Sequence, residues 1–292
     1  MGAKQHYVPR FYLKLWSNNS ENTHIGLYNF KNNLFIANAA ITNQAKEHFF
    51  YGKDNDIEKG LADLEDDVAK ILNGINSGDR LPKPNSKEYA HLFLFTLIQA
   101  QRTMRAVEET NEGLDKLLET ISPEEDKGKY ALRIDDPAVF NLQTLVDTLH
   151  VTTDLSCKLI INNSRLPFII SDDPVIKYNQ FLERKGKRNG LTGLASKGLQ
   201  IFYPVSPNRM LLFYDSKIYK IGDRKKSWVE TTNKEDILGL NLLQALDCSE
   251  QIFFNQTITK WDLEQILEKW KRFYKGKNDK LIELPGKKRN RW

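Results

Sequence analysis

"YAHLFLFTLIQA", residues 89–100, is the stretch that decides the fold. Its apolar side chains surround the helix instead of forming one stripe, which predicts a helix that is buried on every side. The helix-start residues Asn85, Ser86 and Glu88 precede it and place its first turn near Ser86. We therefore expect this helix to be the most buried element, with the rest of the chain built around it.

Helical patterns continue on both sides of this stretch. The segment before it has apolar residues at helical spacing: Ile57, Leu61, Leu64, Val68 and Ile71. After it, Pro123 and Pro137 stand where the first residue of a helix favours proline, which predicts two more helix starts. The middle of the chain is therefore predicted to be helical up to about residue 160.

Strand patterns lie on either side of the helical middle. Residues 24–30 and 33–41 flank an Asn-rich turn and predict a β-hairpin. From Arg165 on, short β-branched and aromatic runs predict strands within residues 166–178, 198–206, 209–215, 217–222 and 250–255. Helices are expected at 232–247 and from Thr259. This segregation predicts an α+β fold: a helical middle with a mostly antiparallel sheet, built from the N-terminal hairpin and the C-terminal short strands.

The domain organisation follows from length and charge. A chain of 292 residues that is 40% hydrophobic can bury a large core, and we expect one α+β domain over residues 1–275. Residues 269–292 contain ten Lys or Arg against two acids, with aromatic residues interleaved, and residues 276–292 are predicted to be a basic tail. Such a tail is typical of a solvated end, and it is also suited to binding nucleic acid.

Composition narrows the class of protein. The two cysteines, Cys157 and Cys248, form no C-x-x-C pair, which argues against a disulfide framework and favours a reducing cytoplasm. No run approaches the roughly 18 to 20 apolar residues of a membrane helix, and the start lacks the apolar core of a signal peptide. The sequence predicts a cytoplasmic protein without a membrane partner; it does not predict the oligomeric state.

A histidine lies in the unusually apolar N-terminal stretch "QHYVPRFYLKLWS", residues 5–17. Aromatic and aliphatic residues crowd around His6, so the segment is expected to be anchored in the core. An imidazole suits proton transfer or metal ligation, and the alternative is a packed, structural histidine. Arg10, four residues on, is either a bidentate phosphate ligand or a plain surface charge.

Polar residues interrupt the apolar helix near its end. Gln99, Gln101 and Arg102 lie in "QAQRTMR", and buried polar groups need partners. This predicts either a hydrogen-bonded core network or a ligand cavity. Glu65 lies beside the apolar stripe of the preceding helix, and the structural alternative is that it forms an ion pair with Arg102.

Acidic residues end a predicted strand at "FIISDDPVI". Asp172 and Asp173 are candidate ligands of a divalent metal, with Glu65 as a third. The alternative is an Asx-type turn in which Asp172 or Ser171 accepts from backbone amides. Lys177 completes a D-x-x-x-K pattern with Asp173, which weakly resembles metal-dependent nucleases.

Together, the stretches "QHYVPRFYLKLW", "KEHFFYG", "QAQRT", "PFIISDDPV" and "FYPVSPNRMLL" resemble the bacterial domain of unknown function 4238 family. The resemblance extends from Gln5 to about Asn255 and implies no settled activity. It does imply that residues 6–9 and 171–174 belong to one shared design.

The candidate residues favour a phosphodiester-processing enzyme, such as an intracellular nuclease. In this hypothesis His6, Asp172 and Arg102 are catalytic and Asp172, Asp173 and Glu65 hold Mg²⁺ or Mn²⁺. The substrate-binding residues would be Arg10, Gln99, Gln101 and Lys177. The alternative is a non-catalytic module that binds a nucleotide, a nucleic acid or a protein. The enzyme hypothesis expects His6, Arg102 and Asp172 to converge on one cavity.

Overall fold

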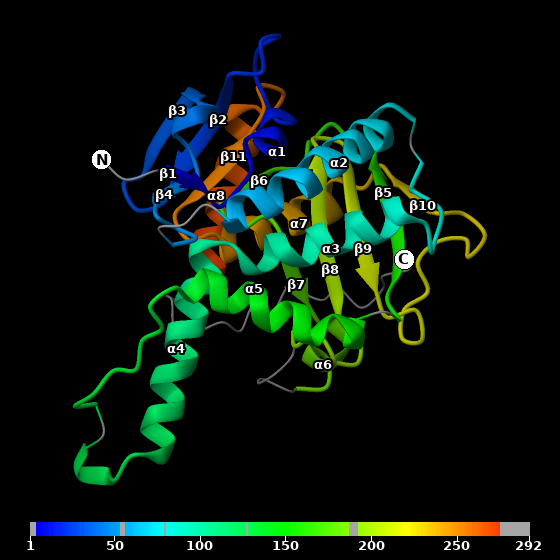
Figure 1. Cartoon of the computed structure of the whole chain (residues 1–292). Coiled ribbons are helices and arrows are strands. Elements are labelled where there is room, and N and C mark those ends of the chain that lie inside the picture. Colours follow the sequence, from blue (N-terminus) through cyan, green and yellow to red (C-terminus); the bar gives the residue numbers. More distant parts are fainter. Residues whose placement is uncertain are drawn as a thin grey trace.

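The computed structural model describes residues 4–52, 56–78, 80–126, 128–152, 154–186 and 192–274 (Figure 1). The predicted basic tail 276–292 lies outside these residues. The strands are β1 (Lys4–His6), β2 (His24–Asn29), β3 (Leu34–Ala40), β4 (Lys46–His48), β5 (Ser156–Asn162), β6 (Ile170–Ser171), β7 (Ile176–Tyr178), β8 (Gln200–Ser206), β9 (Arg209–Tyr214), β10 (Trp228–Thr231) and β11 (Gln251–Phe254). The helices are α1 (Arg10–Lys14), α2 (Asp56–Gly78), α3 (Lys87–Gln101), α4 (Met104–Ile121), α5 (Pro137–Thr148), α6 (Gln180–Glu183), α7 (Lys234–Asp247) and α8 (Lys260–Phe273). The fold class is α+β, as predicted.

Three sheets are present in the described residues. The predicted hairpin β2–β3 is confirmed and forms a four-stranded antiparallel sheet in the order β3-β2-β11-β6. A five-stranded sheet has the order β10-β5-β9-β8-β7, in which β10 and β5 are parallel and the other pairs antiparallel. β1 and β4 form a separate antiparallel pair. The expected sheet of hairpin and C-terminal strands therefore exists, beside a second, larger sheet.

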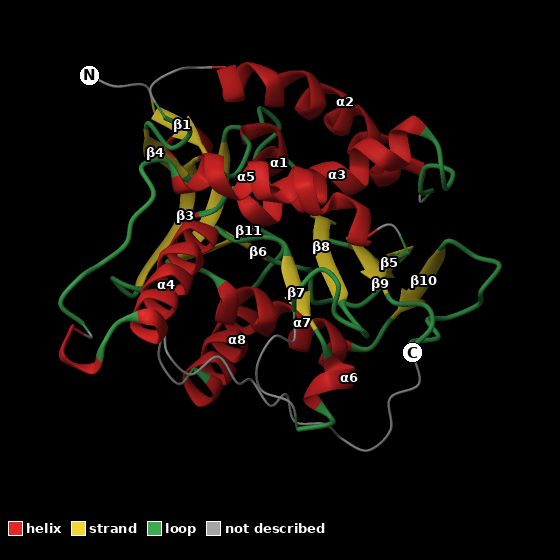
Figure 2. Cartoon of the chain, turned by 60° about the horizontal axis from the view of Figure 1, so that its bottom comes forward, coloured by secondary structure: helices red, strands yellow, loops and turns green. Residues whose placement is uncertain are grey.

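Two layers of helices enclose the five-stranded sheet. α2 and α3 cross one face, and α7 lies on the other (Figures 1 and 2). The side chains of β9 alternate between the layers: Leu211 and Phe213 belong to the core with α1, α2 and α3, while Met210 and Leu212 belong to the core with α7 and α8. This alternation is the period of two that a strand imposes when both of its faces are buried.

Several sequence-based assignments are wrong. Residues 156–162, assigned to the helical middle, form the strand β5, because the run Leu159 to Ile161 fits a buried strand as well as a helix. Residues 217–222 form no strand, since the amides of Ile218 and Tyr219 bond the Asp215 carbonyl and turn the chain. Pro123 is followed only by a 3-10 turn, Glu124–Asp126. The strand β10 was not predicted.

The helix α3 begins where expected, with Ser86 as its N-cap, and Phe95 is fully buried. The expectation that it is the most buried element is wrong. Eight residues of α7 are buried against six of α3. The sequence did not predict the burial of α7, because Asn241 and Gln244 are polar. Both side chains are nevertheless buried, and both have hydrogen-bond partners.

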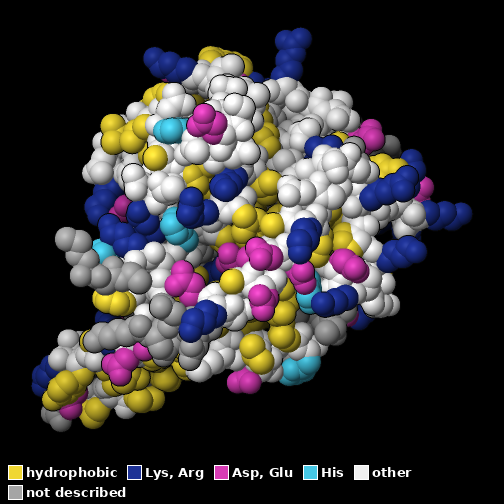
Figure 3. Space-filling view, turned by 45° about the horizontal axis from the view of Figure 1, so that its top comes forward, with side chains coloured by type: hydrophobic (Ala, Val, Ile, Leu, Met, Phe, Trp, Pro, Cys, Tyr) yellow, Lys and Arg dark blue, Asp and Glu magenta, His cyan; other side chains and the backbone are white. Residues whose placement is uncertain are grey.

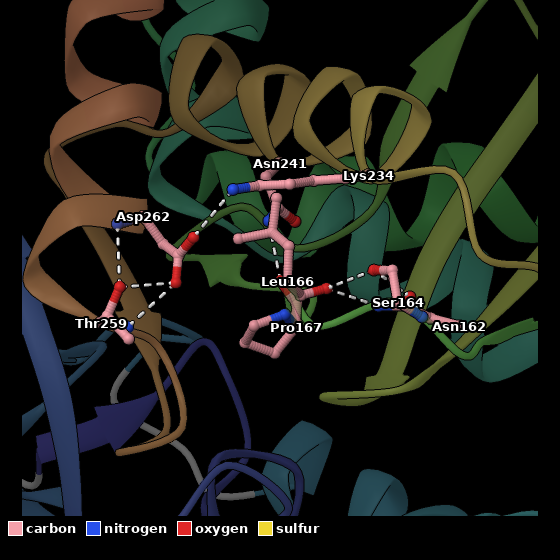
Figure 4. A network of polar contacts seen from close by, with 8 residues as sticks. All are labelled: Asn162, Ser164, Leu166, Pro167, Lys234, Asn241, Thr259 and Asp262. Carbon is pink, nitrogen blue, oxygen red and sulfur yellow. Dashed lines mark hydrogen bonds and ion pairs between the residues drawn. The ribbon is translucent and has the colours of Figure 1, made fainter.

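Those two amides fix the segment 167–174 to α7, and Figure 4 shows the contact between Asn241 and Pro167. Asn241 Nδ2 donates to the Pro167 carbonyl at 2.8 Å, and its Oδ1 accepts from the Ile169 amide at 3.1 Å. Gln244 Oε1 accepts from the Ser171 amide at 2.9 Å, and its Nε2 donates to the Pro174 carbonyl at 2.9 Å. The side chains of α7 thus satisfy the backbone of β6 on the edge that β11 leaves open.

The first turn of α8 contacts the first turn of α7. Thr259 and Asp262 form a capping box, and Asp262 Oδ1 lies 3.3 Å from Lys234 Nζ of α7 (Figure 4). None of the described helices is long and apolar enough to cross a membrane.

Candidate functional site

The N-terminal segment is anchored in the core by its large side chains. Val8, Tyr12, Leu13 and Trp16 are fully buried. The Tyr12 ring stacks on Tyr203 with centroids 5.0 Å apart, and its hydroxyl donates to the Pro204 carbonyl at 2.6 Å. The expected aromatic anchor is confirmed, and none of these contacts uses His6.

Strand pairing brings three basic side chains together at this segment. β1 pairs with β4 so that His6 stands opposite Lys46, and the Tyr7 amide donates to the Ala45 carbonyl at 3.0 Å. Pro9 then starts α1, whose first residue is Arg10. Arg10 and Lys46 therefore flank one imidazole, although forty residues separate His6 from Lys46 in the chain.

The His6 ring is half-buried, and its Nε2 is buried without a hydrogen-bond partner. Burial, followed by the charges of Arg10 and Lys46, lowers the pKa of His6 to about 4. A backbone hydrogen bond at Thr42 opposes this shift. His6 is therefore neutral at pH 7, in a positive local potential.

Arg102 is committed to a buried polar network. Its Nη1 lies 2.6 Å from Glu65 Oε1, and its Nε donates to Gln99 Oε1 at 3.0 Å. The side chain is 1% exposed, and Nη2 is buried without a partner. The ion pair considered from the sequence as the structural alternative is confirmed.

The local turn expected as the alternative to a metal site is made by Ser171, whose hydroxyl accepts from the Asp173 amide at 3.2 Å, whereas Asp172 accepts from backbone amides distant in the chain. The Asp172 carboxylate accepts from the amides of Ser249, Glu250 and Gln251 at 2.8, 2.9 and 3.0 Å. Burial raises the pKa of Asp172 to about 7, against the effect of these three hydrogen bonds. The side chain holds the start of β11 beside β6.

Asp173 is 6% exposed, and its Oδ1 is buried without a partner. Burial, then the charges of Asp247 and Glu109, raise the pKa of Asp173 well above its usual range, while Lys177 on β7 lowers it. Burial and these acidic neighbours therefore favour the protonated form of Asp173. Asp247 and Glu109 are two acidic neighbours that the sequence did not identify.

The predicted metal ligands do not form one site. Glu65 bonds Arg102, and Asp172 bonds three amides. Throughout the described ranges, no three His, Cys, Asp or Glu side chains are placed to hold a metal ion. Both cysteines are unpaired thiols.

The predicted site residues thus fall into three groups: His6 with Arg10, Glu65 with Gln99 and Arg102, and Asp172 with Asp173 and Lys177. Gln101 is half-buried at the end of α3 and joins none of them through a described hydrogen bond. No hydrogen bond or ion pair of the described residues joins His6 directly to Arg102 or Asp172.

Tyr7 connects the His6 group to the Arg102 group. Its carbonyl accepts from Gln99 Nε2 at 3.0 Å, and its ring lies 5.4 Å from Phe50. Burial, followed by the charge of Asp172, raises the pKa of Tyr7, so its hydroxyl stays protonated. The sequence placed Tyr7 in the aromatic anchor and, through the family resemblance, in the stretch 6–9, but it was not a candidate site residue. A tyrosine beside a candidate histidine was the one signal that could have indicated this role.

A family model described as "Protein of unknown function (DUF4238)" matches residues 4–257. The match runs from β1 to just beyond β11, and it excludes α8 and the basic tail. It agrees with the resemblance read from five sequence motifs. No curated protein and no solved structure is significantly similar to the chain.

Proposed function

Because the chain belongs to the DUF4238 family, whose description names no activity, we propose a function from the geometry of the N-terminal site. The chain binds a phosphate-bearing ligand, a nucleotide or a nucleic acid, at His6, Arg10 and Lys46. The observation that supports this is that two cations, Arg10 and Lys46, lie near enough to a neutral imidazole for their charges to act on it. The reducing cytoplasm, where both thiols stay free, is its proposed location.

Among the residues that the structure describes, neither cation forms an ion pair with an acid. Arg10 is exposed and forms no ion pair within the described residues. Lys46 Nζ donates to the Thr42 carbonyl at 2.7 Å and to Asn43 Oδ1 at 3.1 Å, both uncharged. A guanidinium can bind phosphate in bidentate fashion, and a lysine adds a point charge. Burial is the main cause of the lowered His6 pKa, and the charges of Arg10 and Lys46 add to it; such a pair of positive charges attracts anions.

A second candidate is the nuclease. The observation in its favour is that His6 is neutral at pH 7, so one ring nitrogen has a lone pair that can accept a proton. Nε2 is buried, however, and Arg102 and Asp172 are engaged in contacts of their own. Binding is therefore the better-supported function, and Mg²⁺ or Mn²⁺ dependence stays a prediction of the nuclease hypothesis.

One experiment tests both functions. Fluorescence anisotropy with labelled single-stranded DNA and RNA, and thermal shift with nucleotides, measure binding by wild type and by Arg10→Gln/Lys46→Gln. Each lost phosphate contact should reduce the salt slope by roughly 0.7 on a single strand. Lys83→Gln, an exposed lysine elsewhere, is the matched control and should bind as wild type.

Equal binding by the double variant and the control would refute the proposed site. Gel assays of the same nucleic acids with and without Mg²⁺ or Mn²⁺ then separate the two functions. Cleavage by wild type that His6→Gln abolishes would favour the nuclease. Binding without cleavage would leave recognition as the function.

A further inference from the structure

An arm formed by α4 and the loop after it projects from the body of the molecule (Figure 1). α5 packs against the first half of α4, where Thr110 Oγ1 donates to Asn141 Oδ1 at 2.6 Å. Beyond this contact, α4 carries Leu114, Leu117, Leu118 and Ile121 at helical spacing. The apolar stripe thus continues past the last helix that covers it.

The tip of the arm exposes large apolar side chains. Leu117 is 53% exposed and Ile121 is 70% exposed, and Tyr130 and Leu132 in the following loop are 67% and 47% exposed. Hydrophobic side chains, with acidic ones beside them, gather on this protrusion at the lower left of Figure 3. An exposed apolar patch of this kind marks an interaction surface.

The arm is also acidic. Residues 104–136 contain ten Asp or Glu against five Lys or Arg. Some charges pair within the arm, as Arg133 does with Asp115 at 2.6 Å. Glu112 and Glu119 have no ion-pair partner in the described part of the chain. A partner for this surface therefore has to be both basic and apolar.

We propose that the tip of the arm is the docking surface for the chain's own C-terminal segment, residues 275–292. This segment has seven Lys or Arg against two acids, together with Leu281, Ile282, Leu284 and Trp292. Its charge is opposite to that of the arm, and its apolar residues match the exposed stripe. The proposal does not depend on the phosphate-binding site.

The reach of the segment is sufficient. The described chain ends at Tyr274, directly after α8, and both views draw α8 close to the base of α4 (Figures 1 and 2). Eighteen residues remain, and they span up to about 60 Å when extended. The 18 residues of α4 are about 27 Å long, so the segment can extend along the whole arm.

Two other occupants fit less well. A second arm would bring together two surfaces with the same acidic excess, which repel each other. A nucleic acid would meet the same repulsion. The charge of the arm therefore favours the basic segment, and the experiment distinguishes all three.

Zero-length carbodiimide cross-linking of the full-length protein, followed by mass spectrometry, tests the proposal. We expect amide cross-links between lysines of 275–292 and acids of 104–136, and at least a fivefold lower yield in 0.5 M salt. An equimolar mixture of ¹⁴N- and ¹⁵N-labelled protein identifies the occupant. Links within one copy support the proposal, whereas mixed-isotope links would overturn it in favour of a second copy.

Three variants make the test specific. Leu117→Ser/Ile121→Ser should lower the yield at least fivefold, while Leu34→Ser/Phe35→Ser, on exposed residues of β3, should leave it unchanged. Replacing Lys287, Lys288, Arg289 and Arg291 with Gln alters no described residue and should lower the links from Lys275, Lys277 and Lys280. Equal yields in all proteins, or tail links spread evenly over the surface, would overturn the proposal.

Discussion

Gln99 Nε2 donates a hydrogen bond of 3.0 Å to the carbonyl of Tyr7 and so joins α3 to the N-terminal segment. The same amide group accepts from Arg102 Nε through Oε1. One side chain therefore connects the strand that carries His6 with the buried ion pair of Glu65 and Arg102. The N-terminal segment and the helical core are thus joined through the hydrogen bonds of one buried side chain.

The contribution of the Glu65–Arg102 pair to the free energy of unfolding can be measured directly. Arg102→Ala should lower the free energy of unfolding by about 3 to 5 kcal/mol, because it leaves buried acceptors without their partner. Urea denaturation followed by circular dichroism gives the value. The control is Arg133→Ala, which breaks the exposed pair with Asp115 and should cause no measurable loss. A loss of under 1 kcal/mol for Arg102→Ala would contradict the buried network.

The packing of α3 can be tested at Phe95, which is fully buried and packs against Phe11 with ring centroids 5.6 Å apart. Phe95→Ala should cost about 3 to 5 kcal/mol, since the core can close the resulting cavity only in part. Phe140→Ala, on a side chain that is 42% exposed, should cost much less. Equal losses would mean that α3 is peripheral.

The amides of α7 make a separate prediction about the segment that carries Asp172 and Asp173. Asn241→Leu removes the partners of the Pro167 carbonyl and the Ile169 amide, both in a buried environment. The loss should be about 2 kcal/mol, the cost of leaving such groups unsatisfied. Gln101→Leu replaces a half-buried amide with no described side-chain hydrogen bond and should be nearly neutral. Similar effects of the two substitutions would show that α7 does not fix this segment.

Local sequence patterns predicted part of this structure, but they did not predict contacts between residues that are far apart in the chain. The spacing of Glu65 and Arg102 on two apolar helices was enough to suggest their ion pair. The local turn at Ser171 followed from its place at the end of an apolar strand, but the contact of Asp172 with the amide of Ser249 spans 77 residues and was not predicted. The juxtaposition of His6 and Lys46, however, depends on a strand pairing across forty residues, and periodicity carries no information about which strands pair. The strand β5 was missed because a short apolar run fits both periods.

The pH dependence of stability tests the environment of His6. The folded state lowers the pKa of His6 to about 4, whereas an unfolded histidine titrates near 6.5. Between these values the unfolded chain binds a proton that the folded protein does not, so the free energy of unfolding falls as the pH drops from about 6.5 to about 4. His6→Gln removes this contribution. Between about pH 6.5 and pH 4, the free energy of unfolding of the variant should therefore fall by about 2 kcal/mol less than that of wild type. This figure is reduced to allow for the solvent contact of the half-buried ring.

The comparison of wild type with His6→Gln over the same pH range also separates the roles of the residue. Near pH 7 the free energy of unfolding of the variant should lie within about 1 kcal/mol of the wild-type value. The reason is that the segment is anchored without the imidazole, by Val8, Tyr12, Leu13 and Trp16. Parallel pH profiles of the two proteins would show that neither burial nor the charges of Arg10 and Lys46 lower the pKa of His6. A loss of more than about 2 kcal/mol at pH 7 with ligand binding intact would instead make His6 a hydrogen-bonding support of the fold. The imidazole would be identified as part of the anion site by three results together: unchanged stability of the variant at pH 7, a weaker fall of its stability with decreasing pH, and weakened ligand binding.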